Sequence, residues 1–133
     1  MVALWWPAAV RPAEAQGTLT EAVARAREAW LAHDAAGLAS LVDTVVLRLP
    51  GIDDAATAGP GQASRLLGQY LQPSSERGLE LKSVQETGAD RGYAQVERRY
   101  VVRGTSDEIR ETVFLAFRKT RGRWRMSEIR VTP

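Results

Sequence analysis

The stretch that decides the fold is residues 18–50, TLTEAVARAREAWLAHDAAGLASLVDTVVLRLP. Apolar residues recur at helical spacing through its first half, and from Val45 to Leu49 they alternate around Arg48 as in a half-buried strand. The stretch therefore predicts a long helix, a turn, a short helix and a strand, with the long helix lying over a sheet.

Both helices have recognisable starts. Thr18 and Glu21 form a capping box, in which a hydroxyl and a carboxylate satisfy unpaired backbone donors at a helix start. Trp30 anchors the buried face of this helix. His33 follows at its end, where a cation suits the helix dipole, and we interpret it as structural because no companion residue is in view. Asp34 can cap the second helix, which we expect to continue through Val42.

In the remainder of the chain the spacing of the apolar residues changes. Residues 51–61 predict a loop, and residues 62–72 predict a third helix that Pro73 ends. From Gly78 onward the apolar period is two, which predicts strands over Leu79–Glu86, Tyr93–Arg103, Glu108–Lys119 and Arg123–Thr132. The pattern favours an α+β fold of one domain, residues 18–133, in which three helices pack on a strongly curved, mainly antiparallel sheet.

The apolar pattern also predicts strand register. A loop from Gly104 to Asp107 would place Tyr100 opposite Glu111, so that Arg98 becomes a diagonal neighbour of Glu111 on the apolar face. In the last strand the apolar parity changes after Met126, which predicts a β-bulge near Ser127–Glu128.

The composition excludes several classes of site. The chain has no Cys and one His, which excludes disulfides, thiolate zinc sites and multi-His metal sites. No phosphate-loop motif is present, so we predict no cofactor. Eleven Lys or Arg stand against five Asp or Glu from Arg91 onward, but alternating charges suit the solvent face of a sheet, and no aromatic-plus-basic pattern accompanies them. A nucleic-acid partner is not favoured.

The first 17 residues differ from the rest. An apolar run, MVALWWP, precedes Ala13–Glu14–Ala15, which resembles a signal-peptide cleavage site, although no Lys or Arg precedes the run. We keep two interpretations: a signal remnant of an exported or periplasmic protein, or a disordered tail of a cytoplasmic one. The run is too short to span a membrane.

Two passages carry a family resemblance. LAHDAAGLASLVDTVVLRLPG at 31–51 and RGRWRMSEIRV at 121–131 resemble the nuclear transport factor 2-like superfamily, which includes ketosteroid isomerases and SnoaL-like polyketide cyclases. The likeness covers residues 18–132 and is nearest to small bacterial members of unknown function. It implies a cone-shaped fold with a cavity between sheet and helices. It also implies a homodimer through the outer sheet face, where Tyr93, Val101, Phe114 and Ala116 interrupt the charged residues.

The resemblance does not extend to the residues that isomerase activity requires. The resemblance places the general base at Leu49, the oxyanion acid at Leu115 and the tyrosine donor near Ala26, and all three are apolar here. Enolisation needs a base and a donor for the oxyanion, so the resemblance predicts the fold without this chemistry.

Arg98 and Glu111 are the charged residues on the otherwise apolar face. Two interpretations of this pair remain. It is a functional site, in which Arg98 recognises an anion or Glu111 acts as an acid/base, or it is a structural ion pair at the open end of the cone. We predict a non-catalytic module that binds a small apolar or amphipathic ligand or a protein partner. The alternative is a cyclase-, dehydratase- or isomerase-type enzyme in which Glu111 is the acid/base and Arg98 or Tyr100 its electrostatic helper.

Asp53 and Asp54 could reach the cavity mouth. The predicted cavity lining is Trp30, Leu47, Leu49, Leu67, Tyr70, Val96, Arg98, Tyr100, Glu111, Val113, Leu115 and Trp124.

Overall fold

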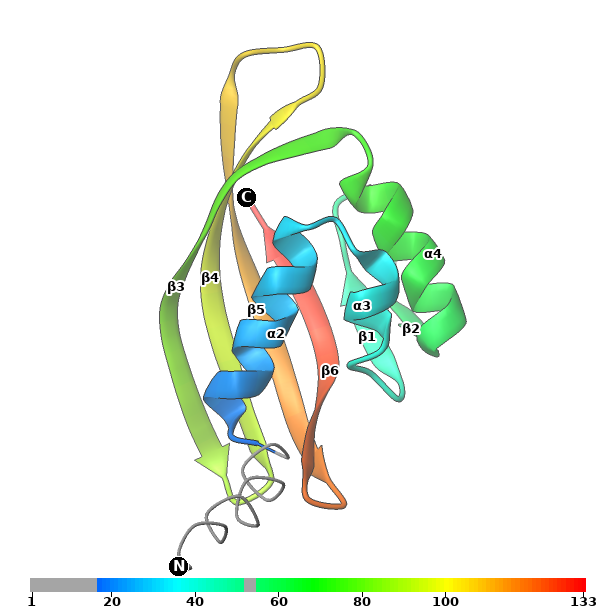
Figure 1. Ribbon diagram of the computed structural model, residues 1–133, viewed down its shortest axis with the longest axis vertical. Helices are drawn as coiled ribbons and strands as arrows, with labels where there is room; N and C mark the ends of the chain where they lie inside the picture. Colours follow the sequence, from blue (N-terminus) through cyan, green and yellow to red (C-terminus); the bar gives the residue numbers. More distant parts are fainter. Residues whose placement is uncertain (1–16, 52–54) are drawn as a thin grey trace, which may run out of the picture.

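The computed structural model describes residues 17–51 and 55–133. The predicted signal remnant or tail, and the placement of Asp53 and Asp54, lie outside these residues. The elements in chain order are α2 (Leu19–Leu31), α3 (Ala35–Ala39), β1 (Val45–Arg48), β2 (Ala56–Ala58), α4 (Pro60–Leu71), β3 (Ser74–Gly88), β4 (Arg91–Val102), β5 (Glu108–Thr120) and β6 (Arg123–Thr132) (Figure 1).

Helix α2 begins as the capping box predicts. The Thr18 hydroxyl accepts a hydrogen bond from the Glu21 backbone N–H at 3.1 Å, and the Glu21 carboxylate accepts one from the Thr18 N–H at 3.0 Å. Two orphan donors of the first turn are thereby satisfied. The buried residues that follow, from Leu19 to Trp30, lie on one face of the helix.

The end of α2 is a Schellman motif, in which two backbone N–H groups close the last turn. The N–H of His33 donates to the carbonyl of Trp30 at 2.9 Å, and the N–H of Asp34 donates to the carbonyl of Ala29 at 2.8 Å. His33 has φ 54, a left-handed conformation that usually selects glycine. Asp34 then caps α3 by accepting from the Gly37 N–H at 2.9 Å, as predicted, although α3 ends at Ala39 rather than Val42.

One six-stranded sheet holds all the strands, in the order β2-β1-β6-β5-β4-β3. Strands β3 to β6 form an antiparallel meander, while β1 pairs in parallel with β6 and antiparallel with β2. The sheet is strongly curved, and the helices lie on its concave side (Figure 1). The predicted α+β class, with helices on a curved and mainly antiparallel sheet, is confirmed.

Two elements differ from the sequence prediction. The expected loop between β1 and α4 contains a three-residue strand, Ala56–Ala58, which exists because it pairs with β1 at the sheet edge. Strand β3 begins at Ser74 instead of Leu79. Both additions depend on pairing with a distant strand, which local periodicity does not reveal.

The predicted register of β4 and β5 is wrong by two residues. Arg98 faces Glu111 directly, and Tyr100 faces Ile109. The N–H of Arg103 donates to the carbonyl of Pro73 at 2.8 Å, so Arg103 belongs to the turn instead of the β4–β5 ladder. A slip of two residues leaves every side chain on its face, so the hydrophobic pattern cannot distinguish the two registers.

The predicted bulge in β6 is confirmed. Ala116 faces Glu128 while Phe117 faces Met126, which leaves Ser127 as the extra residue. Because of this residue, both Met126 and Ile129 point into the core although their positions differ in parity.

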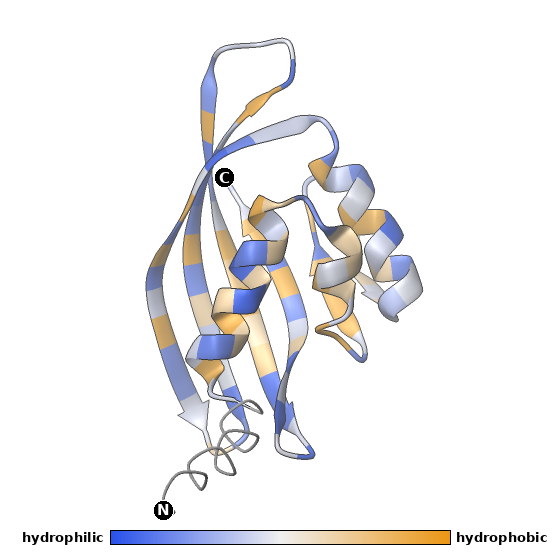
Figure 2. Ribbon diagram, viewed as in Figure 1, coloured by the Kyte–Doolittle hydropathy of each residue, from blue (hydrophilic) through white to orange (hydrophobic). Residues whose placement is uncertain are grey.

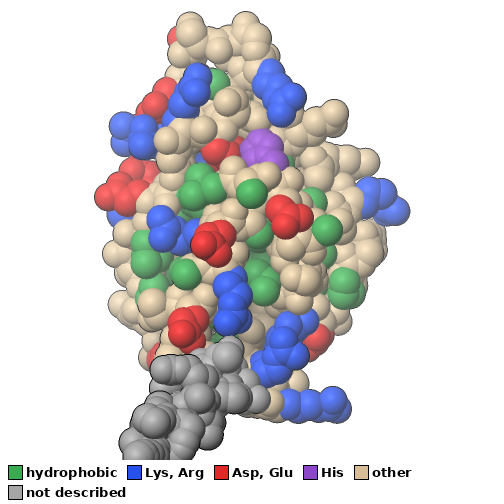
Figure 3. Space-filling view, viewed as in Figure 1, with side chains coloured by type: hydrophobic (Ala, Val, Ile, Leu, Met, Phe, Trp, Pro, Cys, Tyr) green, Lys and Arg blue, Asp and Glu red, His purple; other side chains and the backbone are tan. Residues whose placement is uncertain are grey.

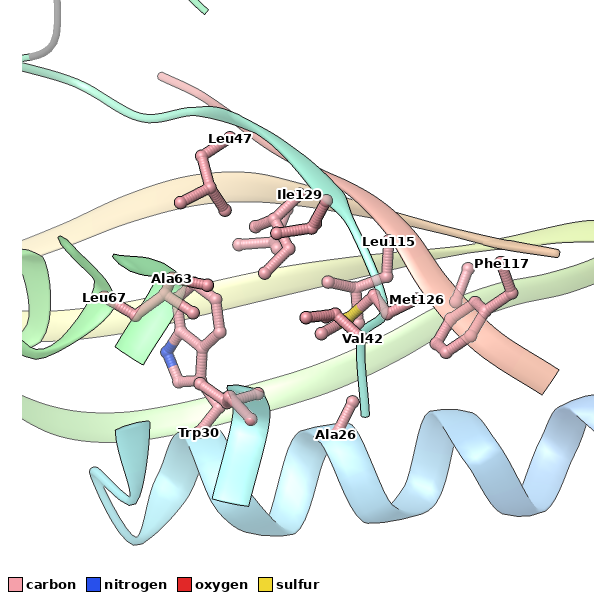
Figure 4. Close-up of a cluster of buried hydrophobic side chains, with 14 of the residues drawn as sticks. Ala26, Trp30, Val42, Leu47, Ala63, Leu67, Leu115, Phe117, Met126 and Ile129 are labelled. Atoms are coloured by element: carbon pink, nitrogen blue, oxygen red, sulfur yellow. The ribbon is translucent and has the colours of Figure 1, made fainter. Parts of the chain in front are cut away.

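The core lies between α2, α4 and the concave face of the sheet. Figure 4 shows Ala26 and Trp30 of α2 directed toward side chains of the sheet, including Leu115 and Met126, with Leu67 of α4 beside Trp30. All five side chains are at most 2% exposed. Figure 2 shows hydrophobic and hydrophilic residues interspersed along the helices and along the strands.

Candidate functional site

Arg98 is the centre of the polar group inside the fold. It lies on β4, facing the helices, and has an exposed fraction of 0%. A buried guanidinium is retained only if its charge and its N–H donors are satisfied. Residues from α2, α4, β3 and β5 meet around it to do so.

The first partner of Arg98 is Glu76, near the start of β3. Nε donates to Glu76 Oε1 at 2.8 Å and Nη2 donates to Oε2 at 2.5 Å, which is a two-pronged charged contact. The indole N–H of Trp30 donates to Oε1 at 3.2 Å, and His33 Nε2 lies 3.1 Å from Oε2. The Glu76 side chain is 4% exposed, so these groups replace its water shell.

The second partner is Glu111 on β5. Its Oε1 accepts from Arg98 Nη1 at 3.1 Å and from the Tyr70 hydroxyl at 2.7 Å. Its Oε2 accepts from the Tyr100 hydroxyl at 3.3 Å. Arg98 Nη1 also donates to the Tyr70 oxygen at 2.8 Å. Glu111 therefore receives hydrogen bonds on both carboxylate oxygens.

Three aromatic rings surround the same guanidinium. Its carbon lies 3.8 Å from the ring centroid of Tyr100, 5.1 Å from Tyr70 and 5.4 Å from Trp30. Such contacts stabilise a cation through the negative ring faces. Trp30 and Tyr70 also meet edge to face, with centroids 6.1 Å apart. We call the whole group the Arg98 cluster: Trp30, His33, Tyr70, Glu76, Arg98, Tyr100 and Glu111.

The pKa shifts of the cluster follow from burial and charge. Burial, with the Glu111 carboxylate nearby, raises the pKa of both Tyr70 and Tyr100, so both hydroxyls remain protonated donors. Burial alone would raise the pKa of Glu76, but the hydrogen bonds and charge of Arg98 outweigh it and the net pKa is lowered. Burial opposes the charge of Arg98 too, and its contacts with Glu76 outweigh this, so the pKa of Arg98 is raised.

Glu76 is the cluster member that sequence reasoning missed. Leu79 and Glu76 both face inward, although their positions have opposite parity, because β3 has a register irregularity between Glu76 and Gly78. Regular alternation back from Leu79 would direct Arg77 inward and Glu76 to solvent. The usable signal was chemical: a guanidinium has five N–H donors, more than Glu111 alone can accept, so a buried Arg98 requires further acceptors.

The other predicted lining residues occupy different places. Leu47, Leu49, Leu67, Val96, Val113 and Leu115 are buried in the apolar core, as is Ala26. Trp124 lies away from the Arg98 cluster, in a separate hollow. The structure thus brings together Trp30, Tyr70, Arg98, Tyr100 and Glu111 from the predicted set, and adds His33 and Glu76.

The hollow at Trp124 has a volume of about 540 Å³ and lies between the start of α2, the end of α3 and the β5–β6 hairpin. Arg125 is fixed there by donating to the Val42 carbonyl at 3.0 Å and by pairing with Asp43 at 3.2 Å. We call it the hairpin hollow. Its lining is Thr18, Ala22, Arg25, Ser40, Leu41, Phe117, Arg123, Trp124 and Arg125.

A smaller hollow of about 250 Å³ lies on the outer face of the sheet. Arg130 crosses the Phe114 ring there, with the guanidinium carbon 4.7 Å from the ring centroid. Tyr93, Gln95, Ala116 and Glu128 complete the lining.

Within residues 17–51 and 55–133, no group of three or more His, Cys, Asp or Glu side chains is arranged to hold a metal ion. None of the helices described there has the length and apolar character needed to cross a bilayer.

Comparisons with known proteins identify the fold. No protein-family model matches the chain, and no curated protein matches it. Among solved structures, a ketosteroid isomerase-like protein from Erwinia carotovora atroseptica has a TM-score of 0.71 at 19% identity, covering 85% of this chain and 91% of its own. A DUF4783 family protein from Bacteroides uniformis has a TM-score of 0.70 at 14% identity, covering 86% and 96%.

A third structure was solved with a small molecule bound. It is a hypothetical protein with a ketosteroid isomerase-like fold from Catenulispora acidiphila, in complex with trimethylamine, with a TM-score of 0.68 at 13% identity and 87% of each chain covered. Similarity at this level of identity establishes architecture, and the chemistry of each site is separate. The chain therefore has the nuclear transport factor 2-like, ketosteroid isomerase-like fold.

Proposed function

We propose that this protein is a non-catalytic binding module that takes a small amphipathic anion in the hairpin hollow. The observation that carries the first half of this proposal is the state of Glu111. Both of its carboxylate oxygens accept hydrogen bonds, from Arg98, Tyr70 and Tyr100. A general base must present a free lone pair to its substrate. Three hydrogen bonds leave Glu111 about one of its four lone-pair sites, on Oε2, and its side chain is 10% exposed, so little of the carboxylate is open to a substrate.

The enzyme alternative is correspondingly less well supported. Arg98, its proposed electrostatic helper, already makes charged contacts with two carboxylates and is fully buried. Tyr100 is engaged by Glu111, and its raised pKa keeps it a hydrogen-bond donor. A cyclase or isomerase mechanism through Arg98 would require the core to open around it.

The lining of the hairpin hollow supports the ligand class. Its volume of about 540 Å³ falls within the range of small-molecule sites, roughly 300 to 1,000 Å³. Phe117 and Trp124 form part of its apolar lining, and Arg123 and Arg125 add positive charge, that of Arg125 being offset by Asp43. Trimethylamine, found with one structural relative, is a cation at neutral pH and would be repelled by these arginines.

The test uses dodecanoate and naphthalene-1-sulfonate as probes. Titration into isotopically labelled protein should shift the amide resonances of Phe117 and the indole resonance of Trp124. Ser40→Tyr, which places a ring in the hollow, should weaken binding at least tenfold. Ser106→Tyr in the exposed β4–β5 turn is the matched control and should leave binding unchanged. Equal binding by both variants would contradict the proposed site.

The proposal that the protein is non-catalytic is tested by a separate measurement. Each probe, and any ligand that copurifies with the protein, should be recovered chemically unchanged after incubation, as judged by mass spectrometry. Conversion by the unaltered protein that Glu111→Gln abolishes would favour the enzyme alternative.

A second candidate, self-association through the outer sheet face, is favoured by the hollow over Phe114. Tyr93 and Ala116 line it together with charged residues, the mixed composition expected of an interface. Sedimentation equilibrium should show a dimer that Phe114→Glu dissociates. A monomer at micromolar concentrations would exclude this candidate.

A further inference from the structure

The hairpin hollow continues into a second hollow on the helical side of the molecule. This second hollow has a volume of about 370 Å³ and lies between α2 and α3. Arg25, Ser40 and Leu41 line both hollows, so the two adjoin and form one elongated depression. We call the second hollow the helix groove; besides the three shared residues, its lining is Glu28, Ala29, Ala32, Asp34 and Gly37.

One flank of α2 follows the whole depression. The residues of this flank that line the two hollows are Thr18, Ala22, Arg25, Glu28, Ala29 and Ala32. Residues spaced by three and four positions lie above one another on a helix, so these six form a single stripe. The stripe extends roughly 20 Å at the rise of an α-helix. The depression therefore suits an elongated ligand better than a compact one.

The hairpin end of the depression carries uncompensated positive charge. Arg123 lines this end and makes no ion pair with any residue in 17–51 or 55–133, whereas Arg125 pairs with Asp43 at 3.2 Å. The first turn of α2 lies at the same end, and the helix dipole adds partial positive charge there. This end suits an anionic group, with Arg123 as its partner.

The far end of the depression carries negative charge where a helix favours positive charge. The last turn of α2 contains Glu28 and no basic residue, and Asp34 follows shortly after it. Cations stabilise the carboxyl end of a helix, and carboxylates oppose its dipole there. Glu28 forms no ion pair with the described residues, and His33 contacts Glu76 on the inner side instead. Local rules of this kind are most often broken at functional sites.

Asp34 keeps one carboxylate oxygen available in the helix groove. Its Oδ1 accepts a hydrogen bond from the Gly37 N–H at 2.9 Å, while Oδ2 has no hydrogen-bond partner in the part of the chain that the structure describes. A side chain at residue 37 would collide with Oδ2. Glycine at this position therefore leaves room for the second oxygen beside Glu28.

The two ends of the depression thus differ in sign of charge. Figure 3 shows the face that carries α2 and α3, with acidic side chains near its middle and Lys and Arg side chains below them, toward the β5–β6 hairpin of Figure 1. The residues between the two ends include Ala22, Ala29 and Leu41, which are apolar. A complementary ligand has an anionic group, an apolar chain and a cationic group, in that order.

We propose that the ligand is an elongated zwitterion, which places its anionic group at Arg123, its apolar chain along α2 and its cationic group between Glu28 and Asp34. This proposal rests on the proposed function, because it adds a second charge to the amphipathic anion of the hairpin hollow. An alkyl chain with a carboxylate at one end and an ammonium group at the other is the simplest molecule of this class.

The experiment compares two probes of equal length, 12-aminododecanoate and 12-hydroxydodecanoate, by calorimetric titration of the full chain at neutral pH and low salt. Both carry the carboxylate, and only the first carries a cation at the far end. The amino compound should bind about fivefold more tightly, which is the effect of one exposed ion pair. The charged groups of 4-aminobutanoate are too close together to reach both ends, so it should bind more weakly than either.

Two variants locate the cation. Glu28→Gln/Asp34→Asn should lower the affinity for 12-aminododecanoate to that for 12-hydroxydodecanoate. Asn caps a helix as well as Asp does, so α3 should keep its start. The matched control, Glu86→Gln/Asp107→Asn, removes the same charge from residues that line neither hollow, and it should keep the preference for the amino compound.

Two further variants locate the rest of the ligand. Arg123→Gln should weaken binding of both dodecanoate derivatives and of naphthalene-1-sulfonate, whereas Arg118→Gln, on the same hairpin but outside the lining, should not. Ala32→Tyr places a ring at the far end of the helix groove. It should weaken binding of the long probes, while naphthalene-1-sulfonate, which is compact enough for the hairpin hollow, should still bind.

The outcomes distinguish the zwitterion from the simpler anion. If naphthalene-1-sulfonate binds in the hairpin hollow but the amino and hydroxy compounds bind equally, the zwitterion proposal is wrong and the proposed function stands. Equal loss of the preference in Glu28→Gln/Asp34→Asn and in the matched control would indicate a response to net charge and would also overturn the zwitterion proposal. Failure of every anionic probe would overturn the proposed function, and the zwitterion proposal with it.

Discussion

Arg98 and Arg99 are consecutive residues on β4 and point to opposite faces of the sheet. Each pairs with acidic side chains, but Arg98 is 0% exposed beside Glu76 and Glu111, whereas the Arg99 side chain is 37% exposed beside Glu108. The contacts of Arg98 measure 2.5 to 3.1 Å and that of Arg99 measures 3.4 Å. Both residues are arginines that pair with glutamates, and they differ in how deeply they are buried.

The difference teaches where an ion pair matters to stability. Breaking a buried pair leaves a charge without water or partner, which typically costs about 3 to 5 kcal/mol. An exposed pair is compensated by solvent and is worth at most about 1 kcal/mol. The two arginines therefore separate the energetic role of pairing from that of burial within a single strand.

The largest expected effect is the loss of the central cation. Arg98→Met leaves Glu76 and Glu111 facing each other in the core without the guanidinium, and should destabilise the fold by about 5 kcal/mol or more. Arg99→Met should cost less than about 1 kcal/mol. Urea unfolding at neutral pH measures both, and similar midpoints for the two variants would refute the contrast.

The next largest effect distinguishes the two carboxylates that pair with Arg98, those of Glu76 and Glu111. Glu76→Gln removes the two-pronged contact with Arg98 and should cost about 3 to 5 kcal/mol, whereas Glu111→Gln leaves that contact in place and should cost less. Glu108→Gln on the exposed face is the control and should change little. A larger loss for Glu111→Gln would show that the hydroxyls of Tyr70 and Tyr100 bind the charge more strongly than the geometry indicates.

Acid should remove part of this stabilisation. The pKa of Glu76 is lowered in the folded protein, so the unfolded chain takes up the proton more readily. Its contribution is fully present above the unfolded value, about 4.3, and is lost as pH falls through the lower folded value. The stability difference between the unaltered protein and Glu76→Gln should therefore shrink below about pH 4. A difference that stays constant down to pH 3 or so would contradict the sign of the shift.

The smallest effect compares two tyrosines on opposite faces of β4. The Tyr100 hydroxyl donates to buried Glu111 at 3.3 Å, and the Tyr93 hydroxyl donates to exposed Gln85 at 3.0 Å. Tyr100→Phe should cost about 1 kcal/mol or slightly more, since hydrogen bonds to charged groups exceed neutral ones. Tyr93→Phe should be nearly neutral. Thermal unfolding resolves the two, and a reversed order would mean that hydrogen-bond length outweighs burial.

The sequence predicted the fold well because its cues are local. The capping box, the helical spacing and the change to period two each concern neighbours in the chain, and the bulge at Ser127 shows as a change of parity between Met126 and Ile129. Parity also placed Arg98 and Glu111 on the inner face. It could not fix their pairing, because registers that differ by two residues bury the same side chains.

The candidate site was predicted only in part, since two of its members depend on backbone irregularities. Glu76 turns inward through a break in the β3 ladder, and His33 reaches Glu76 from a left-handed helix end. Neither the break in β3 nor the left-handed helix end can be recognised from the residue types in the sequence. The hairpin hollow could not be predicted for a different reason: its walls come from α2, the residues after α3, β5 and β6, which only the folded chain brings together.

The aromatic rings and carboxylates around Arg98 are the groups with which proteins commonly recognise free alkylammonium and guanidinium ligands. Arg98 can thus be regarded as a ligand that the chain carries on a tether of methylene groups. Tethering raises its effective concentration to the millimolar range or above, so a dissolved cation at ordinary concentrations would compete poorly for the position. Arg98 therefore occupies the position inside the cone that such a cationic ligand would take.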